Sequence, residues 1–289
     1  MSVWIAYSHA KINLGLHVLE KLPTGYHEIE TGFCFIEWKD HFEVKNSDQF
    51  SLSLSDTSIP SGENNLISKA YQTFERYVGL RNHYSFKIRK AIPTGAGLGG
   101  GSSNAALTLR MLNKMEEAEL SVDDLTDLSR TLGADISFFI KGETGIGRGL
   151  GSDIESLPIQ PDAWIVTVYP GFESSTAKAY QNCVPNPEPE FSLKKVLTEE
   201  PLDEWRYLLV NDLEAPVVAN NELIGNIKDQ LYDLGAEYAS MTGSGSSIFG
   251  IFEQDFVAIN AYESFHKLNF FANMTRPLFK PDRGIYRKE

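Results

Sequence analysis

Residues 93–104 read Pro-Thr-Gly-Ala-Gly-Leu-Gly-Gly-Gly-Ser-Ser-Asn, and this stretch decides the fold because it joins a predicted strand to a predicted helix. Residues 84–92 alternate apolar and basic side chains, which is typical of a half-buried strand. Residues 102–115 place apolar side chains at helical spacing. Glycines let a ligand approach the backbone, and free N–H groups at a helix start favour an anion. The stretch therefore predicts a phosphate-binding loop rather than a flexible linker.

The loop matches neither of the two common phosphate-binding patterns. Gly95, Gly97 and Gly100 fit the dinucleotide motif, but that motif needs a second strand after one helix. Here a second helix follows, which we expect to be capped by Ser121 and to end at Gly133. No lysine follows the glycines, so the pattern of a Walker loop is also missing.

The remaining chain predicts an α+β protein of two domains. Its length of 289 residues fits two domains, which we place at 1–157 and 158–289. In the second half, residues 163–169 predict a strand, residues 221–234 predict a helix, and two short strands are expected to flank residues 242–247.

Charge and composition exclude several classes of function. Acidic residues outnumber basic ones 39 to 26, giving a net charge of −13, which argues against nucleic acid or an anionic membrane as partner. An anionic substrate must then be captured by local groups. No apolar run is long enough to span a bilayer, no signal peptide is visible, and Cys34 and Cys183 cannot form a disulfide framework. We therefore expect a cytoplasmic protein; its oligomeric state is left open.

The basic C-terminal segment is expected to be a solvated terminus. Residues 276–289 carry five basic and two acidic side chains and contain no strong structural pattern.

Three motifs in order resemble those of the GHMP small-molecule kinases: Ala10-Lys-Ile-Asn-Leu14, the loop at 93–104, and Met241-Thr-Gly-Ser-Gly-Ser-Ser247. The resemblance implies a two-domain α+β fold with the active site in the cleft between the domains. It also implies that ATP binds with its phosphates over the loop and its adenine near Asn65. The residues implied in nucleotide binding are Pro93, Thr94, Gly95, Ala96, Gly97, Leu98, Gly99, Gly100, Gly101, Ser102, Ser103 and Asn65.

Other residues resemble one branch of this family, whose acceptor is methylerythritol carried on cytidine diphosphate. They are Gly25-Tyr-His-Glu28, the triple glycine before Ser102, and Gly133-Ala-Asp135 followed by Phe138-Phe139. The branch phosphorylates the 2-hydroxyl of this small molecule in the non-mevalonate route to isoprenoids. Two alternatives are a GHMP kinase with another alcohol acceptor and a pseudokinase that binds nucleotide without transferring phosphate.

Three positions depart from the family pattern. His9 and Ser137 stand where the family usually has proline, and residues 147–152 lack the usual Gly-x-Gly-Glu ending. These departures affect the expected shape of loops and remove no group that performs chemistry.

Two residues are implied in catalysis. By itself, Asp135 reads as a helix cap or a solvated turn residue, but the resemblance makes it the catalytic base. Lys11 is a lone charge in an apolar stretch and needs a partner. The family places a lysine beside the catalytic aspartate, where an ammonium keeps the carboxylate ionised. Asn13 either bonds the substrate, supports Lys11 or is a strand-end turn residue.

Four residues are implied in substrate binding. In the family, residues matching Tyr26 and His27 stack on cytosine and hydrogen-bond its edge. Thr176 and Tyr180 match a threonine and a phenylalanine four residues apart, so we predict that Tyr26 and Tyr180 sandwich the base. The alternative is that Tyr180 only packs a helix.

No metal-binding cluster is visible in the sequence. Magnesium is expected to arrive with ATP, held by phosphates, water and a hydroxyl of Ser102 or Ser103.

Overall fold

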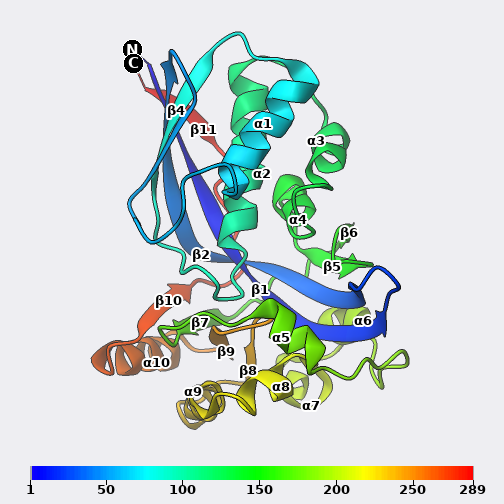
Figure 1. Cartoon of the computed structure of the whole chain (residues 1–289). Helices are drawn as coiled ribbons and strands as arrows, with labels where there is room; N and C mark the ends of the chain where they lie inside the picture. Colours follow the sequence, from blue (N-terminus) through cyan, green and yellow to red (C-terminus); the bar gives the residue numbers. More distant parts are fainter. Residues whose placement is uncertain (1, 289) are drawn as a thin grey trace.

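Two long antiparallel strands run through the molecule from one end to the other (Figure 1). The structure, a computed structural model, describes residues 2–288. β1 (Val3–Lys21) and β2 (His27–Ser47) form the centre of a seven-stranded sheet, in the order β11-β1-β2-β4-β3, with β5 paired to β2 and β6 paired to β5. The other strands are β3 (Ser51–Leu54), β4 (His83–Arg89), β5 (Gly145–Arg148), β6 (Asp153–Ser156) and β11 (Ile285–Lys288).

Four helices pack beside the upper part of this sheet (Figure 1): α1 (Leu66–Val78), α2 (Gly100–Met115), α3 (Val122–Ser129) and α4 (Ile136–Lys141). The helix predicted over 102–115 is confirmed and begins two residues earlier. The predicted cap at Ser121 is confirmed as a capping box with Asp124, which satisfies the first N–H groups of α3. The prediction that this helix runs to Gly133 is wrong, because the chain turns after Ser129 and enters α4.

A four-stranded sheet, in the order β10-β7-β9-β8, forms the centre of the lower part. The strand predicted over 163–169, the helix over 221–234 and the strands flanking 242–247 are all confirmed, with shifts of at most one residue at the ends. The strands are β7 (Trp164–Tyr169), β8 (Tyr238–Met241), β9 (Ile248–Phe252) and β10 (Phe271–Thr275). The helices are α5 (Thr176–Gln181), α6 (Leu193–Glu199), α7 (Trp205–Leu208), α8 (Glu214–Val218), α9 (Glu222–Asp233) and α10 (Asp255–Lys267), with a short 3-10 turn at Leu202–Glu204.

The C-terminal segment belongs to the first sheet. β11 pairs antiparallel with β1, with Val3 opposite Lys288 and Ala6 opposite Ile285, and both ends of the chain lie side by side (Figure 1). The expectation of a solvated terminus is therefore wrong: Phe279 is buried, and the backbone of β11 finds hydrogen-bond partners along the edge of β1.

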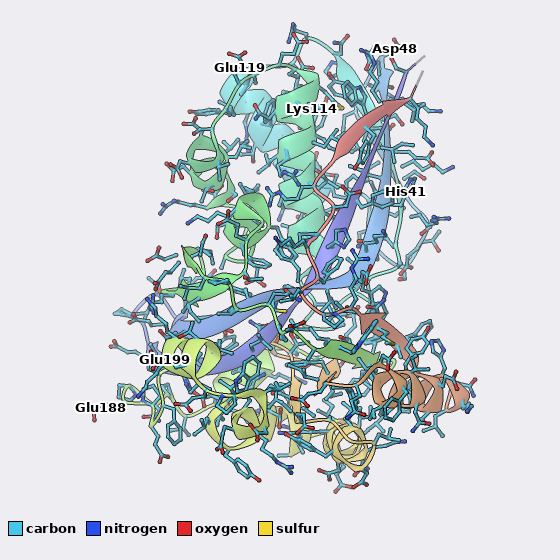
Figure 2. All side chains as sticks on the ribbon, turned by 180° about the vertical axis from the view of Figure 1, so that it is seen from behind. His41, Asp48, Lys114, Glu119, Glu188 and Glu199 are labelled. Carbon is cyan, nitrogen blue, oxygen red and sulfur yellow. The ribbon has the colours of Figure 1, made fainter. Side chains whose placement is uncertain are left out.

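The proposed domain boundary near Leu157 lies in the connection between β6 and β7, that is, between the two sheets. It stays a prediction, and β11 crosses back from the second half into the first sheet. Seen from behind, the labelled acidic residues Glu119, Glu188 and Glu199 project from the periphery (Figure 2). Among the helices in residues 2–288, none combines the length and the apolarity that a bilayer crossing requires.

Candidate active site

A cavity of about 1320 Å³ lies where the two halves meet around β1. Its walls come from β1, the turn at 25–27, the loop at 93–102, the segment 130–135, the start of α5 and the loop at 243–245. The structure brings all of the candidate site residues to this cavity except Ser103. Segments far apart in the sequence therefore contribute to one site.

The glycine-rich loop turns its carbonyls toward the protein and leaves its N–H groups free. No N–H group of residues 95–102 donates to another protein group in the described part of the chain. This leaves a row of donors at the start of the 16-residue helix α2, whose positive end adds to their attraction for an anion. The five carbonyls of residues 95–99 accept, in order, from Ser174 N, Ser247 N, Lys11 Nζ, Lys11 N and Ser103 N, at 2.9–3.1 Å.

Two glycines of the loop stand where no side chain fits. Gly97 has φ +76°, and a Cβ there would lie 2.2 Å from the carbonyl oxygen of Thr242. Gly99 has φ +69°, and its Cβ would meet the ring of Phe139 at 2.9 Å. The second and third sequence motifs are thus in direct backbone contact, which fixes the loop against the lower half.

A buried charge network holds the two ends of the loop. Asp40 is fully buried and accepts hydrogen bonds from the backbone N–H groups of Ala91, at 2.7 Å, and Ile92, at 2.9 Å. Its other oxygen accepts from Asn104 near the start of α2, at 2.8 Å, and pairs with Lys90. Asp40 therefore links the end of β4 to the start of α2, and the Lys90 ammonium satisfies its buried charge.

Lys11 and Asp135 meet in the cavity. Lys11 Nζ lies 3.5 Å from Asp135 Oδ2, with the lysine side chain 5% exposed and the aspartate side chain 31% exposed. Burial lowers the pKa of Lys11, and the Asp135 carboxylate opposes this shift. Lys11 Nζ also donates to Gly97 O at 3.0 Å and to Asn13 Oδ1 at 2.6 Å. The ammonium thus connects the phosphate loop to the carboxylate.

Asp135 does not cap the helix that it precedes. It stands at the N-cap position of α4, but its side chain makes no capping hydrogen bond. The reading of Asp135 as a cap is therefore wrong, and its carboxylate faces the cavity instead.

The two departures near Asp135 fit one another. The Ser137 hydroxyl donates to Ser152 O at 2.9 Å. A proline at position 137 has no donor group and could not make this hydrogen bond. This contact holds the segment that ends at Ser152 beside the carboxylate, where Gly151 would place a Cβ 4.0 Å from Asp135 Oδ1.

Asn13 supports Lys11. Its amide oxygen accepts from Lys11, and its amide nitrogen donates to Thr31 Oγ1 at 2.8 Å. Its backbone N–H donates to Thr242 Oγ1 at 3.0 Å. Both ends of the amide are occupied, so of the three roles considered the structure supports the positioning of Lys11. Direct contact of Asn13 with substrate stays a prediction.

An aromatic contact lies at the far end of the cavity. His27 stacks on Tyr180, with ring centroids 4.9 Å apart and an interplanar angle of 22°. Tyr26 is 65% exposed on the turn between β1 and β2, and both Tyr26 and Tyr180 line the cavity. The predicted sandwich of a base between Tyr26 and Tyr180 stays a prediction. Thr176 Oγ1 lies 2.8 Å from Ser244 Oγ at the same side of the cavity.

Two residues predicted to bind nucleotide make hydrogen bonds within the protein. Ser103 is buried, does not line the cavity, and its hydroxyl donates to His9 O at 2.7 Å. Its predicted contact with phosphate or magnesium stays a prediction. Asn65 lines the cavity, but its amide caps α1 through Ile67 N and donates to Pro60 O at 2.8 Å. Its contact with a nucleotide stays a prediction.

Sequence reasoning missed three supporting residues. Asp40 and Lys90 were overlooked because charges in alternating strands normally face solvent. Asn211 is buried and donates to Met241 O at 2.7 Å and Gly243 O at 2.9 Å, which fixes the third motif. Its only sequence signal is a polar pair directly after the apolar residues 208–210.

Comparisons with known proteins agree with this geometry. The model of the GHMP kinases N terminal domain matches residues 65–143, and that of the GHMP kinases C terminal matches residues 194–269. The chain therefore belongs to the GHMP kinases, and the glycine-rich loop and Asp135 lie within the residues that the N-terminal model matches.

The relatives place the chain in one branch of that class. The 4-diphosphocytidyl-2-C-methyl-D-erythritol kinase of Bacteroides thetaiotaomicron is 40% identical over 257 residues, which cover 87% of this chain and 93% of the relative. That of Pelodictyon phaeoclathratiforme is 36% identical over 282 residues, covering 94% and 96%. A crystal structure of 4-(cytidine 5'-diphospho)-2C-methyl-D-erythritol kinase superposes with a TM-score of 0.80 at 30% identity, covering 94% of this chain and 98% of that one. Within the GHMP kinases, the chain belongs to the 4-diphosphocytidyl-2-C-methyl-D-erythritol kinase family.

Proposed function

We propose that this protein transfers the γ-phosphoryl group of ATP to the 2-hydroxyl of 4-diphosphocytidyl-2-C-methyl-D-erythritol, a step of the non-mevalonate route to isoprenoids. The observation that carries the proposal is the Lys11–Asp135 pair, 3.5 Å apart, on the wall of one cavity. That cavity has free backbone donors on one side and the His27–Tyr180 stack on another. The names of the relatives at 34–40% identity support the choice of acceptor.

The loop at 95–102 binds the triphosphate through its free N–H groups. Because the chain has a net charge of −13, attraction of a polyanion must come from such local donors and from the cavity's own ammonium groups. Lys11, Lys21 and Lys90 all line the cavity. Hydrogen bonds to the carbonyls of residues 95–99 already hold the loop in place. Its N–H donors therefore need little reorganisation when charge develops on the transferring group.

Asp135 accepts the proton of the acceptor hydroxyl while the hydroxyl oxygen attacks the γ-phosphorus. A new oxygen–phosphorus bond forms, the bond between the γ-phosphorus and the bridging oxygen breaks, and ADP leaves with the bond's electron pair. Lys11 keeps Asp135 ionised and lies next to the phosphate loop through Gly97 O, so its charge also offsets that of the transferring group.

The cytosine end of the acceptor binds at the aromatic side of the cavity. Burial and the nearby Lys21 charge lower the pKa of His27, so its imidazole is neutral at pH 7 and has one donor and one acceptor for a base edge. Tyr180 supplies a ring face, and the exposed Tyr26 can close over the base from the turn. Thr176 and Ser244 add hydroxyls nearby.

Magnesium fits this site only together with the nucleotide. Among residues 2–288, no group of three or more His, Cys, Asp or Glu side chains is arranged to hold a metal, so phosphate oxygens and water must supply most ligands. Ser102 lines the cavity and is the hydroxyl that remains for this role. Bound magnesium neutralises phosphate charge and orients the γ-phosphoryl group. We place the reaction in the cytoplasm, which the two free thiols support.

The test is ATP-dependent phosphorylation of the cytidyl substrate, with mevalonate and homoserine as alternative acceptors. We expect turnover of the cytidyl substrate alone. Asp135→Asn should lower kcat about 100-fold or more while the KM for ATP changes little. Turnover of another alcohol in preference would identify a different GHMP kinase, and nucleotide binding without any turnover would identify a pseudokinase.

A second variant tests the binding of the base. Tyr26→Ala should raise the KM of the cytidyl substrate about 5-fold or more, as expected for the loss of one stacking contact, and should spare ATP. Equal loss for both substrates would mean that Tyr26 has a structural role.

A further inference from the structure

The C-terminal segment, residues 276–288, is tied to the elements that carry the phosphate loop and the catalytic aspartate. Arg110 on α2 donates to Arg283 O at 2.7 Å, and Arg283 donates to Ile140 O on α4 at 2.6 Å. α2 starts at the phosphate loop, and α4 starts directly after Asp135. The segment therefore joins β1, α2 and α4 through residues that do not line the cavity.

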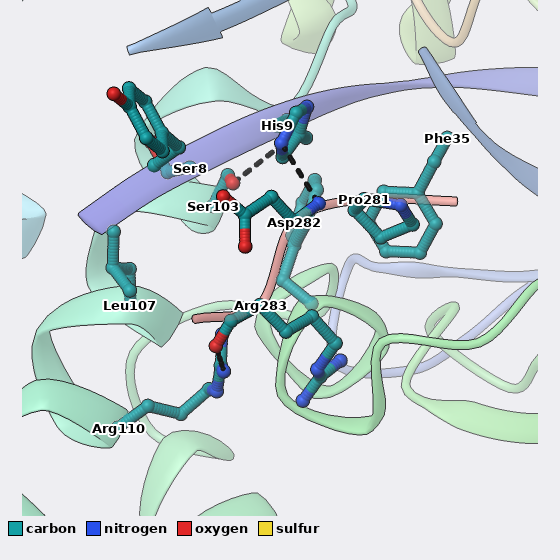
Figure 3. Close-up of a pocket in the computed structure, with 11 residues that line it drawn as sticks. Ser8, His9, Phe35, Ser103, Leu107, Arg110, Pro281, Asp282 and Arg283 are labelled. Atoms are coloured by element: carbon teal, nitrogen blue, oxygen red, sulfur yellow. Dashed lines mark hydrogen bonds between the residues drawn. The ribbon is translucent and has the colours of Figure 1, made fainter. Parts of the chain in front are cut away.

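Besides the pairing of β11 with β1, the segment contacts β1 at the side chain of His9 (Figure 3). The Asp282 N–H donates to His9 Nε2 at 3.2 Å, and the ring of Phe279 lies 5.2 Å from the imidazole. The His9 carbonyl accepts from the Ser103 hydroxyl at 2.7 Å. The side chain of His9 thus binds the C-terminal segment, and its main chain binds the first turn of α2.

The backbone at His9 depends on contacts outside the sheet. The register of β1 on β2 shifts between His9 and Lys11, so the regular ladder is interrupted there. Two residues further on, the Lys11 N–H donates to Leu98 O in the phosphate loop at 3.0 Å. A proline at position 9, as in the family pattern, offers no side-chain acceptor to the segment.

The protonation state of His9 suits this contact. An N–H donor at Nε2 requires that nitrogen to be unprotonated, which places the imidazole proton on Nδ1. Burial and the Lys39 charge lower the pKa of His9 to about 4, opposed by the Ile36 carbonyl and Asp282. Arg110 and Arg283 line the same small pocket and add positive charge. The imidazole is therefore neutral and accepting at pH 7.

We propose that His9 is a positioning residue of the phosphate loop: it fastens the C-terminal segment to β1 and thereby holds the first turn of α2, with its free N–H groups, in the position that binds nucleotide phosphates. This rests on the nucleotide site of the proposed function. It accounts for the departure from proline at position 9.

The first experiment compares His9→Phe with His9→Gln in the full-length chain. Phenylalanine keeps the contact with Phe279 and loses the acceptor, whereas glutamine restores an acceptor oxygen. His41→Phe is the matched control, since His41 lies on β2 away from the cavity (Figure 2). We expect the Kd for ATP, measured by calorimetry, to rise about fivefold in His9→Phe, the value for one lost hydrogen bond, and to stay within twofold in the other two. Hydrogen exchange at Asp282 should accelerate in His9→Phe alone.

A second pair of variants removes the same hydrogen bond from the other side. Asp282→Pro lacks the N–H donor, and Asp282→Ala keeps it while losing the same carboxylate. Asp282→Pro should weaken ATP binding more than Asp282→Ala and should add nothing to His9→Phe. An unchanged Kd for ATP in both His9→Phe and Asp282→Pro, despite faster exchange of the segment, would overturn the proposal, as would equal losses in His9→Phe and His9→Gln. ATP binding is measured without the alcohol substrate. The test of His9 therefore stays valid even if the proposed alcohol substrate is wrong.

Discussion

Replacing Gly97 by alanine should destabilise the protein and damage the active site, although only a methyl group is added. Gly97 has φ +76°, where an L-residue costs about 1–2 kcal/mol. The new Cβ would lie 2.2 Å from Thr242 O, a backbone atom that cannot rotate away. The clash would push the loop at 93–104 away from the loop at 241–247, which adds an overpacking cost of about 1–3 kcal/mol. We therefore expect the free energy of unfolding to fall by about 2–5 kcal/mol.

Gly101→Ala is the matched control within the same loop. A Cβ at Gly101 has Leu66 Cδ1, at 3.4 Å, as its nearest neighbour, and the residue is helical without a positive φ. Because alanine is the better helix former, this variant should be neutral or more stable by about 0.5–1 kcal/mol. The same chemical change should thus have opposite signs four residues apart.

The assay is urea unfolding followed by circular dichroism, together with the KM for ATP. Gly97→Ala should also raise that KM and lower kcat, because Gly97 O accepts from Lys11 Nζ and moves with the displaced loop. A Gly97→Ala protein within about 1 kcal/mol of wild type, or a Gly101→Ala protein that is equally destabilised, would refute the close contact between the second and third motifs.

Three further predictions concern the supports of the site. Asp40→Asn leaves the Lys90 ammonium without its buried partner, so the free energy of unfolding should fall by about 3 kcal/mol in a urea titration; a change under about 1 kcal/mol would show that the pair is solvated. The pKa of His9 falls from 6.5 in the unfolded chain to about 4 in the fold, so the unfolded state binds more protons between these values and stability is lost as the pH falls from 6.5 to 4. This contribution is on the order of 3 kcal/mol, and His9→Phe should remove it from the pH dependence of unfolding; equal pH profiles for both proteins would contradict the burial of a neutral His9. Tyr180→Leu removes the ring face beside His27 and should raise the KM of the cytidyl substrate several-fold with little change in Tm, and a KM equal to wild type would assign Tyr180 to helix packing alone.

Local patterns predicted most of the elements that surround the site. The alternation in 84–92, the helical spacing in 102–115 and the cap at Ser121 depend on neighbours within a few residues, and each appears in the structure. The ends were less accurate: α3 stops at Ser129 because the chain must turn into α4, and that need comes from packing rather than from the local sequence.

The contacts within the site were less accessible to such reasoning. The stack joins His27 at the start of β2 to Tyr180 on α5, more than 150 residues further along the chain, so no local pattern predicts it. In the sequence, Asp40 and Lys90 resemble ordinary surface charges. Only in the fold do the end of β4 and the start of α2 bury them together.

By itself, the sequence determined which chemical groups this protein has at its disposal: a glycine loop with free amides before a helix, a lysine in an apolar strand and an aspartate after a helix stop. Only the tertiary structure decided that Lys11 and Asp135 lie 3.5 Å apart, that the third motif closes on Gly97 and that the C-terminal segment returns to β1. The physical reason is range. Propensities and capping act over a few residues, whereas these meetings are set by the pairing of strands and the packing of helices from distant parts of the chain.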